Sequence, residues 1–211
     1  MPRRSQQDKA ESHERIVDIA AARIRQDGTA TPSVAEIMQA AGLTHGGFYK
    51  HFDSRDDLIA EAVDRTFADS QTATAAVIDE AEDPLKAFVE WYVSTEHRDN
   101  PASGCGVVSL GAEASRADPR VRAAYTAQVK RYLVQLEQLL GGEGEGEGEG
   151  EGEGDGGTEG AADPDARRQA TVMLATLVGA VLVSRAVDDP ALSDEIIGDV
   201  RAAIVRTRGA G

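Results

Sequence analysis

The sequence is poor in cysteine, histidine and aromatic residues. Cysteine occurs once, at Cys105, there are four histidines, and aromatics make up 4% of the 211 residues. A single cysteine excludes an intramolecular disulfide and suits a reducing cytoplasm. Few aromatics beside abundant alanine, valine, leucine and isoleucine favour packed helices over a β-sandwich or barrel. We therefore expect an all-α, cytoplasmic protein.

Long apolar runs are lacking as well. The longest, Val172 to Val183, has 12 residues and is interrupted by Thr176, whereas a spanning helix needs about 20 apolar residues. The N-terminus, MPRRSQQDKAESHERI, has no apolar segment behind its arginines, so no secretory signal is expected. No membrane partner is predicted.

Motifs for catalysis and for metal binding are also absent from the sequence. The four histidines show no metal-ligand spacing, there is no nucleophile motif, and no glycine-rich loop follows a strand. The sequence therefore predicts neither an enzyme nor a bound metal or cofactor.

Positive charge is scarce overall but unevenly distributed. The formal net charge is −15, which by itself argues against a nucleic-acid partner. Residues 1–55 nevertheless carry eight Lys/Arg against seven Asp/Glu, so the excess of negative charge lies entirely in the remainder. Within the first segment, Arg3, Arg4 and Lys9 are either a flexible arm that contacts the DNA backbone or a solvated tail.

Many of the acidic residues lie in one low-complexity tract, GGEGEGEGEGEGEGDGG. Ten acidic residues and no basic ones fall between Gly141 and Asp165. Alternating glycine and carboxylate cannot bury enough surface to offset the entropy of ordering, so residues 141–163 are predicted to form a disordered loop. It is either an insertion without specific function or an electrostatic element that discourages improper DNA contacts.

Apolar stripes at helical spacing, separated by capping residues, predict about nine helices and no strand. The first ends near Asp27-Gly28, and the second opens on Ser33 with Glu36 three residues later, the pattern of a capping box. The others are expected at Thr44–His51, from Ser54, from Asp83-Pro84 to Asn100-Pro101, after Ser103-Gly104, and from Asp118-Pro119, Asp163-Pro164 and Pro190.

Two short helices joined by the residues AGLT match a helix-turn-helix, whose second helix enters the major groove of DNA. Gly42 supplies the turn, Leu43 fills the space between the helices, and Thr44 can cap the second one. Phe48 and Phe52, four residues apart, are expected to anchor that helix in the core. The glycine pair Gly46-Gly47 would let the backbone approach DNA closely.

The run SVAEIMQAAGLTHGGFYKHFDSRDDL, from Ser33 to Leu58, resembles the DNA-binding signature of TetR-family transcriptional regulators. This resemblance implies a three-helix N-terminal DNA-binding domain, residues 1–55, and a helical regulatory and dimerisation domain, residues 56–211. It implies base-edge contacts by His45, Gly46 and Gly47. It also implies contacts to phosphates or nearby bases by Ser33, Thr44, Tyr49, Lys50, His51 and Arg55.

The same resemblance implies a homodimer, a palindromic double-stranded DNA operator, and a small-molecule effector that releases a repressor from it. The dimer surface is expected on the last two helices, at Val172, Leu174, Gly179, Ala180, Val183, Ile197, Val200 and Ile204. Aromatic rings line many ligand pockets, and the residues predicted to line this one are Phe67, Phe88, Trp91, Tyr92, Tyr125, Tyr132 and Met173.

Two other interpretations stay open. Cys105 precedes an expected helix start, where the helix dipole favours thiolate, so the chain could be a thiol-based sensor of oxidants or electrophiles; a buried, inert cysteine is the alternative. The chain could also be a helical ligand-binding protein that does not bind DNA.

Overall fold

The computed structural model describes residues 2–30, 32–141 and 164–208. In these ranges the chain forms nine α-helices and two 3₁₀ helices, η1 and η2, with no strand, as the apolar pattern predicts. In chain order they are α1 Pro2–Asp27, α2 Val34–Ala40, η1 His45–Lys50, α3 Arg55–Asp79, α4 Pro84–Tyr92, α5 Thr95–Asp99, η2 Pro101–Ser103, α6 Gly106–Ala114, α7 Pro119–Gly141, α8 Pro164–Ala186 and α9 Pro190–Arg208.

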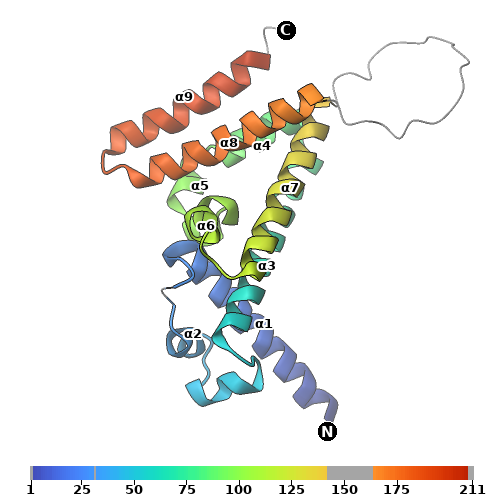
Figure 1. Cartoon of the computed structure of the whole chain (residues 1–211), viewed down its shortest axis with the longest axis vertical. Helices are drawn as coiled ribbons and strands as arrows, with labels where there is room; N and C mark the ends of the chain where they lie inside the picture. The colour runs from blue at the N-terminus through green and yellow to red at the C-terminus, as the bar shows by residue number, and fades with distance from the viewer. Residues whose placement is uncertain (1, 31, 142–163, 209–211) are drawn as a thin grey trace, which may run out of the picture.

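The helices are arranged along one long axis (Figure 1). α2 and the 3₁₀ turn that follows it lie at one end, and the antiparallel pair of α8 and α9 lies at the other. α1 packs along α3, α7 packs along α8, and α6 sits between α1, α7 and α8. One continuous core, from Ile16 on α1 to Ile197 on α9, connects the two ends.

The first helix is much longer than its apolar stripe predicts. α1 has 26 residues and begins at Pro2, so the backbone around Lys9 is helical and the interpretation as a flexible arm is wrong. Exposed polar side chains support this part of the helix, as in the bond from Gln7 to Glu11 one turn later. α1 ends where Gly28 adopts a positive φ of 84°.

A single helix was expected from Asp83-Pro84 to Asn100, but the chain forms two. α4 ends at Tyr92, and Ser94 then caps α5 by accepting a hydrogen bond from the backbone N–H of His97. The serine hydroxyl competes for backbone donors and so starts a new helix. The break turns His97 into the core, where it is 7% exposed.

Helix α8 begins at Pro164, as the sequence predicts. It has 23 residues and is long and apolar enough, by length and composition alone, to cross a membrane, which the 12-residue run interrupted by Thr176 did not indicate. In this fold α8 packs against α5, α6, α7 and α9. Of the predicted disordered loop, 141–163, Gly141 is the last residue of α7, and residues 142–163 lie outside the described residues.

Candidate DNA-binding surface and regulatory core

The turn after α2 is fixed by Gly42, whose φ is +73°. Its N–H donates to the carbonyl of Gln39 at 3.0 Å, and the N–H of Leu43 donates to the carbonyl of Met38 at 2.8 Å. These two bonds form a Schellman motif, which requires a left-handed residue at the position of Gly42. Leu43 is half-buried against the core, so the predicted turn and filler residues are both confirmed.

The segment after the turn is a 3₁₀ helix, η1, rather than an α-helix. The N–H of Gly47 donates to the carbonyl of Thr44 at 2.9 Å, a three-residue step, and two glycines weaken the α-helical alternative. Thr44 occupies the N-cap position, but its side chain makes no capping hydrogen bond. Thr44 is therefore at the predicted N-cap position, but the expected hydrogen bond from its side chain is not formed.

No steric contact within the chain requires the two glycines of η1. A Cβ at Gly46 would meet nothing within 4 Å, and at Gly47 it would meet only Met38 and Thr44 at ordinary contact distances. Neither has a positive φ. Neither a close contact nor a positive φ therefore requires glycine at these two positions.

Most side chains predicted to contact DNA lie on the surface of η1. Tyr49 is 73% exposed, and Thr44, His45 and Lys50 are also exposed. Phe48 and Phe52 are buried, and their rings stack at 5.5 Å. The segment thus presents hydroxyl, imidazole and ammonium groups outward on an anchored backbone, as the sequence predicts.

His51 differs from its neighbours because it is partly enclosed. Its Nδ1 is buried without a hydrogen-bond partner. Burial, together with the nearby His13, Lys9 and Lys50, lowers its pKa, so the ring is neutral at neutral pH. His51 is therefore suited to packing and to donating or accepting one hydrogen bond, and not to contacting phosphate as a cation.

Ser33 and Arg55 both have partners within the chain. Ser33 and Glu36 form the full capping box of α2. Arg55 donates through Nη2 to the carbonyl of Thr29 at 2.6 Å. These contacts position the loop before α2 and the start of α3, so a phosphate would have to share donors that already serve the fold.

A direct contact joins this end of the molecule to α6. The carboxylate of Glu113 on α6 accepts hydrogen bonds from the backbone N–H and the hydroxyl of Thr29, at 2.8 and 2.6 Å. A Cβ at Gly28 would come within 2.1 Å of the same carboxylate, so glycine is needed there for the approach as well as for its φ.

The residues predicted to line an effector pocket pack against one another instead of around a cavity. Phe88 lies 5.5 Å from Tyr92 and 6.4 Å from Tyr132, measured between ring centroids. Trp91, Tyr125 and Met173 are half-buried at the margin of the same core, and Phe67 is buried. The two hollows described below involve none of the seven.

Sequence reasoning missed the polar groups enclosed with these rings. Gln128 on α7 is fully buried; its Oε1 accepts from Gln71 and Arg131, while its Nε2 has no partner. The Tyr92 hydroxyl is also buried without a partner, and burial raises its pKa well above the ordinary value. Gln128 falls within the apolar stripe that begins at Val121, which is the signal that could have identified it.

Cys105 lies at the N-cap of α6 but is not accessible. It is 3% exposed, and its Sγ lies 3.4 Å from the hydroxyl of Tyr132. Its backbone N–H donates to Nε2 of His97 at 2.9 Å, and Nδ1 of His97 lies 2.7 Å from the carbonyl of Tyr92. The predicted helix start is correct, and the thiol is enclosed.

The predicted dimer residues separate into two groups. Leu174, Ala180 and Ile197 are buried in the core of their own chain, so they are not available to a partner, and Val200 and Ile204 are half-buried. Val172 and Val183 are 62% and 45% exposed, on one face of α8. Gly179 lies between them on that face, where a Cβ would meet nothing within 4 Å.

A hollow of about 750 Å³ lies beside η1 and the start of α3. Four carboxylates are part of its lining, from Asp53, Asp57, Glu61 and Asp64. Among the described residues, no group of His, Cys, Asp and Glu has the arrangement of a metal site.

Two sequence families match this chain. The family described as bacterial regulatory proteins, tetR family, matches residues 16–62. The tetracyclin repressor-like C-terminal domain matches residues 81–199. Together they span η1 and most of the helices that follow it.

Curated relatives match over part of their length. The HTH-type transcriptional regulator AcrR of Shigella flexneri is 38% identical over 61 residues, which are 29% of this chain and 28% of AcrR. An uncharacterized HTH-type transcriptional regulator of Mycobacterium tuberculosis is 33% identical over 119 residues, 53% of this chain and 57% of that protein. The chain therefore spans less than two thirds of either relative.

Solved structures share the whole fold. A TetR transcriptional regulator from Chloroflexus aurantiacus superposes with a TM-score of 0.73 at 24% identity, covering 94% of this chain and 96% of that one. The reduced form of Escherichia coli NemR gives 0.69 at 21% identity, covering 92% and 95%. At these identities the likeness shows the fold alone.

Proposed function

Because the chain belongs to the TetR family of DNA-binding bacterial transcriptional regulators, we propose that it is a ligand-released repressor that binds a palindromic operator as a homodimer. The observation that carries this proposal is η1, whose exposed polar side chains and unhindered glycines form the end of the molecule opposite α8 and α9 (Figure 1). The proposed site of action is the cytoplasm.

Residues 1–55 are the proposed DNA-binding domain and residues 56–211 the regulatory domain. In the proposed DNA-binding domain, His45 and the backbone at Gly46 and Gly47 contact base edges. The phosphate contacts come from Thr44, Tyr49 and Lys50. Ser33, His51 and Arg55 add contacts near the backbone of the DNA. Ser33 and Arg55 would share donors that already make hydrogen bonds within the chain, whereas Nδ1 of His51 has no such partner.

Dimerisation is proposed through the outer face of α8. An exposed stripe with Val172, Gly179 and Val183 leaves apolar area in water, and a second copy would bury it. Val200 and Ile204 on α9, half-buried, would border the contact. A dimer presents two copies of η1 to two half-sites of DNA, which explains the expected palindrome.

The proposed effector enters the aromatic core between α3, α4 and α7. The support is the pair of buried donors without partners, the Tyr92 hydroxyl and Nε2 of Gln128, because such groups cost free energy until a ligand or water accepts their hydrogen bonds. A ligand that separates the packed rings would bind the two states of the bundle unequally, as release requires.

A thiol-sensing repressor is the second candidate function. Cys105 is the N-cap of α6, and Glu113 near the end of α6 contacts Thr29 of the proposed DNA-binding domain. A group attached to the thiol would therefore displace a helix that contacts this domain. An alkene electrophile such as N-ethylmaleimide would form an S–C bond while the thiol proton is transferred to the neighbouring carbon. Release by this reagent that is unchanged in Cys105→Ser would exclude the sensor.

A mobility-shift assay tests the main proposal against a protein that binds ligands but not DNA. The full chain is mixed with DNA from upstream of its own gene, with unrelated DNA as competitor, at two salt concentrations. Specific binding that weakens steeply with salt is expected, by about one unit of log-log slope per phosphate contact. Absence of a shift at low salt would contradict DNA binding.

A further inference from the structure

A hollow of about 500 Å³ lies where α1, α5, α6 and α8 meet. It is separate from the aromatic core proposed for the effector, since the two share no lining residue. Its lining contains three arginines from three different helices, three other polar residues and four apolar ones. The lining consists of Arg25, Gln26, Arg98, Asp99, Pro101, Val108, Ser109, Leu182, Arg185 and Ala186.

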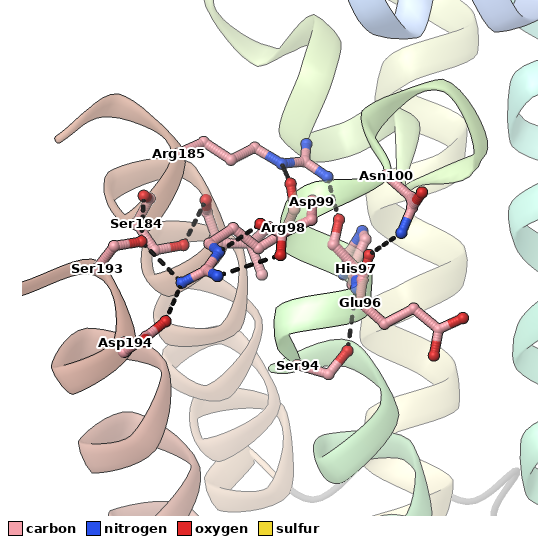
Figure 2. Close-up of polar contacts among 11 residues, drawn as sticks. Ser94, Glu96, His97, Arg98, Asp99, Asn100, Ser184, Arg185, Ser193 and Asp194 are labelled. Carbon is pink, nitrogen blue, oxygen red and sulfur yellow. Dashed lines mark hydrogen bonds and ion pairs between the residues drawn. The ribbon is translucent and has the colours of Figure 1, made fainter. Parts of the chain in front are cut away.

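Arg185 is the cation of this hollow without a carboxylate partner. Its Nε donates to the carbonyl of Arg98 at 2.9 Å and its Nη2 to the carbonyl of His97. Among the described residues it forms no ion pair, and Figure 2 shows its third nitrogen with no contact drawn. A half-buried guanidinium held only by carbonyls has no carboxylate in direct contact; its burial lowers its pKa, and Asp99 of the same hollow opposes that shift at longer range.

The chain is shaped to hold Arg185 in this position. A Cβ at Gly104 would come within 2.9 Å of Nη2 of Arg185 and 3.0 Å of the His97 ring, so a side chain there would displace one of them. The other two arginines are already neutralised. Arg25 pairs with Asp69 at 3.0 Å, and Arg98 pairs with Asp99 at 2.7 Å.

Ser109 supplies a second group without a partner. Its Oγ is buried and makes no hydrogen bond, although a serine hydroxyl in a helix commonly bonds a carbonyl of the preceding turn. An unsatisfied hydroxyl and a guanidinium with a spare donor in the lining of one hollow match the two oxygens of a carboxylate. The apolar wall of Pro101, Val108 and Leu182 suits a short hydrocarbon chain.

We propose that this hollow binds a small organic carboxylate, whose oxygens are held by Arg185 and Ser109 and whose apolar part lies against Pro101, Val108 and Leu182. The bound anion would join α8, through Arg185, to α6, through Ser109. Occupancy would therefore fix the position of α6 relative to α8, and Glu113 of α6 contacts Thr29 before α2. Only an effect of occupancy on DNA binding rests on the proposed function; the binding of the carboxylate does not.

Calorimetry of the full-length protein without DNA tests the site directly. Sodium octanoate is titrated at constant ionic strength into wild type, Arg185→Gln and Ser109→Ala, with octanamide and inorganic phosphate as further probes. Wild type should bind octanoate saturably, and each variant should bind it about tenfold or more weakly. Wild type should also bind octanamide and phosphate more weakly than octanoate, by a similar factor. Ser109→Ala is the stringent variant, because its hydroxyl makes no bond whose loss would disturb folding.

Ser115→Ala is the matched control, since this exposed serine near the end of α6 lies outside the hollow and should leave octanoate binding unchanged. Octanoate binding of equal strength in wild type and Ser109→Ala, or no saturable binding, would overturn the proposal. Equal binding of phosphate and octanoate would overturn the organic class of ligand. A mobility shift on the same samples separates this failure from a failure of DNA binding.

Discussion

The carboxylate of Glu113 accepts two hydrogen bonds from Thr29, the second residue after the end of α1, at 2.8 Å from its N–H and at 2.6 Å from its hydroxyl. The two residues are 84 positions apart in the sequence. Arg55 donates to the carbonyl of the same residue. Thr29 therefore has hydrogen bonds to both α3 and α6, and it links α6 to the loop that precedes α2.

Replacing Glu113 with alanine should lower the free energy of unfolding by about 2 kcal/mol, because two donors lose a charged acceptor. Urea denaturation measures the change. Glu90→Ala, at an exposed position on α4, is the control and should change stability by less than about 0.5 kcal/mol. Equal stability of both variants would show that the contact does not hold the loop.

Gly46→Ala should separate folding from DNA binding. Its φ is not positive and a Cβ would meet nothing within 4 Å, so stability should stay equal or rise by up to about 1 kcal/mol. Operator affinity should fall by about tenfold or more, because a methyl group keeps the backbone away from the groove.

Fluorescence anisotropy on labelled operator DNA and thermal unfolding of the same samples measure these two effects. Gly141→Ala, at the end of α7, also has open space around its Cβ and should leave affinity unchanged. Unchanged affinity in Gly46→Ala would refute the close approach at this glycine.

Val183→Glu should convert a dimer into a monomer, because the proposed contact would bury a carboxylate without a partner, at a cost of several kcal/mol. Light scattering coupled to size exclusion gives the mass. Val134→Glu on α7 is matched in chemistry and in exposure, 48% against 45%, and should leave the mass unchanged. The account of α8 fails if wild type is monomeric or if both variants have the same mass.

Stability should fall between neutral pH and pH 5 because of His97. Burial lowers the pKa of this ring from 6.5 to about 4, so the unfolded chain takes up a proton where the folded chain does not. The contribution is fully present above pH 6.5 and is lost as pH falls toward 4, by about 2 kcal/mol between pH 7 and pH 5.

Urea denaturation at the two pH values measures this loss, and His97→Gln should reduce it. A ring nitrogen of His97 that titrates near 6.5 in the folded protein, followed by NMR, would contradict the assignment.

The parts of the fold that were predictable from the sequence depend on local chemistry. Ser33 with Glu36, Gly42, and the prolines at positions 119, 164 and 190 start or end helices through contacts within a few residues, and the structure confirms each. The exposed face of η1 follows from the burial of Phe48 and Phe52, four residues apart.

The parts that were not predictable depend on distant segments or on competing caps. The split of α4 from α5 follows from the hydroxyl of Ser94, which the apolar stripe does not register. The contacts of Glu113 with Thr29 and of Arg185 with Arg98 each join residues more than 80 positions apart. The packing of the aromatic residues against one another was not predictable either, because their spacing is the same whether the rings enclose a ligand or one another.

The salt dependence of operator binding, compared between wild type and Lys50→Ala, tests the central claim most directly. If η1 meets DNA, the loss of one phosphate contact should weaken binding and reduce the log-log salt slope by about 1. Lys86→Ala, which removes an equally exposed ammonium from α4, should change neither. An identical slope and affinity in wild type and Lys50→Ala, or an equal effect of the two lysines, would contradict the assignment of η1 as the DNA-binding element.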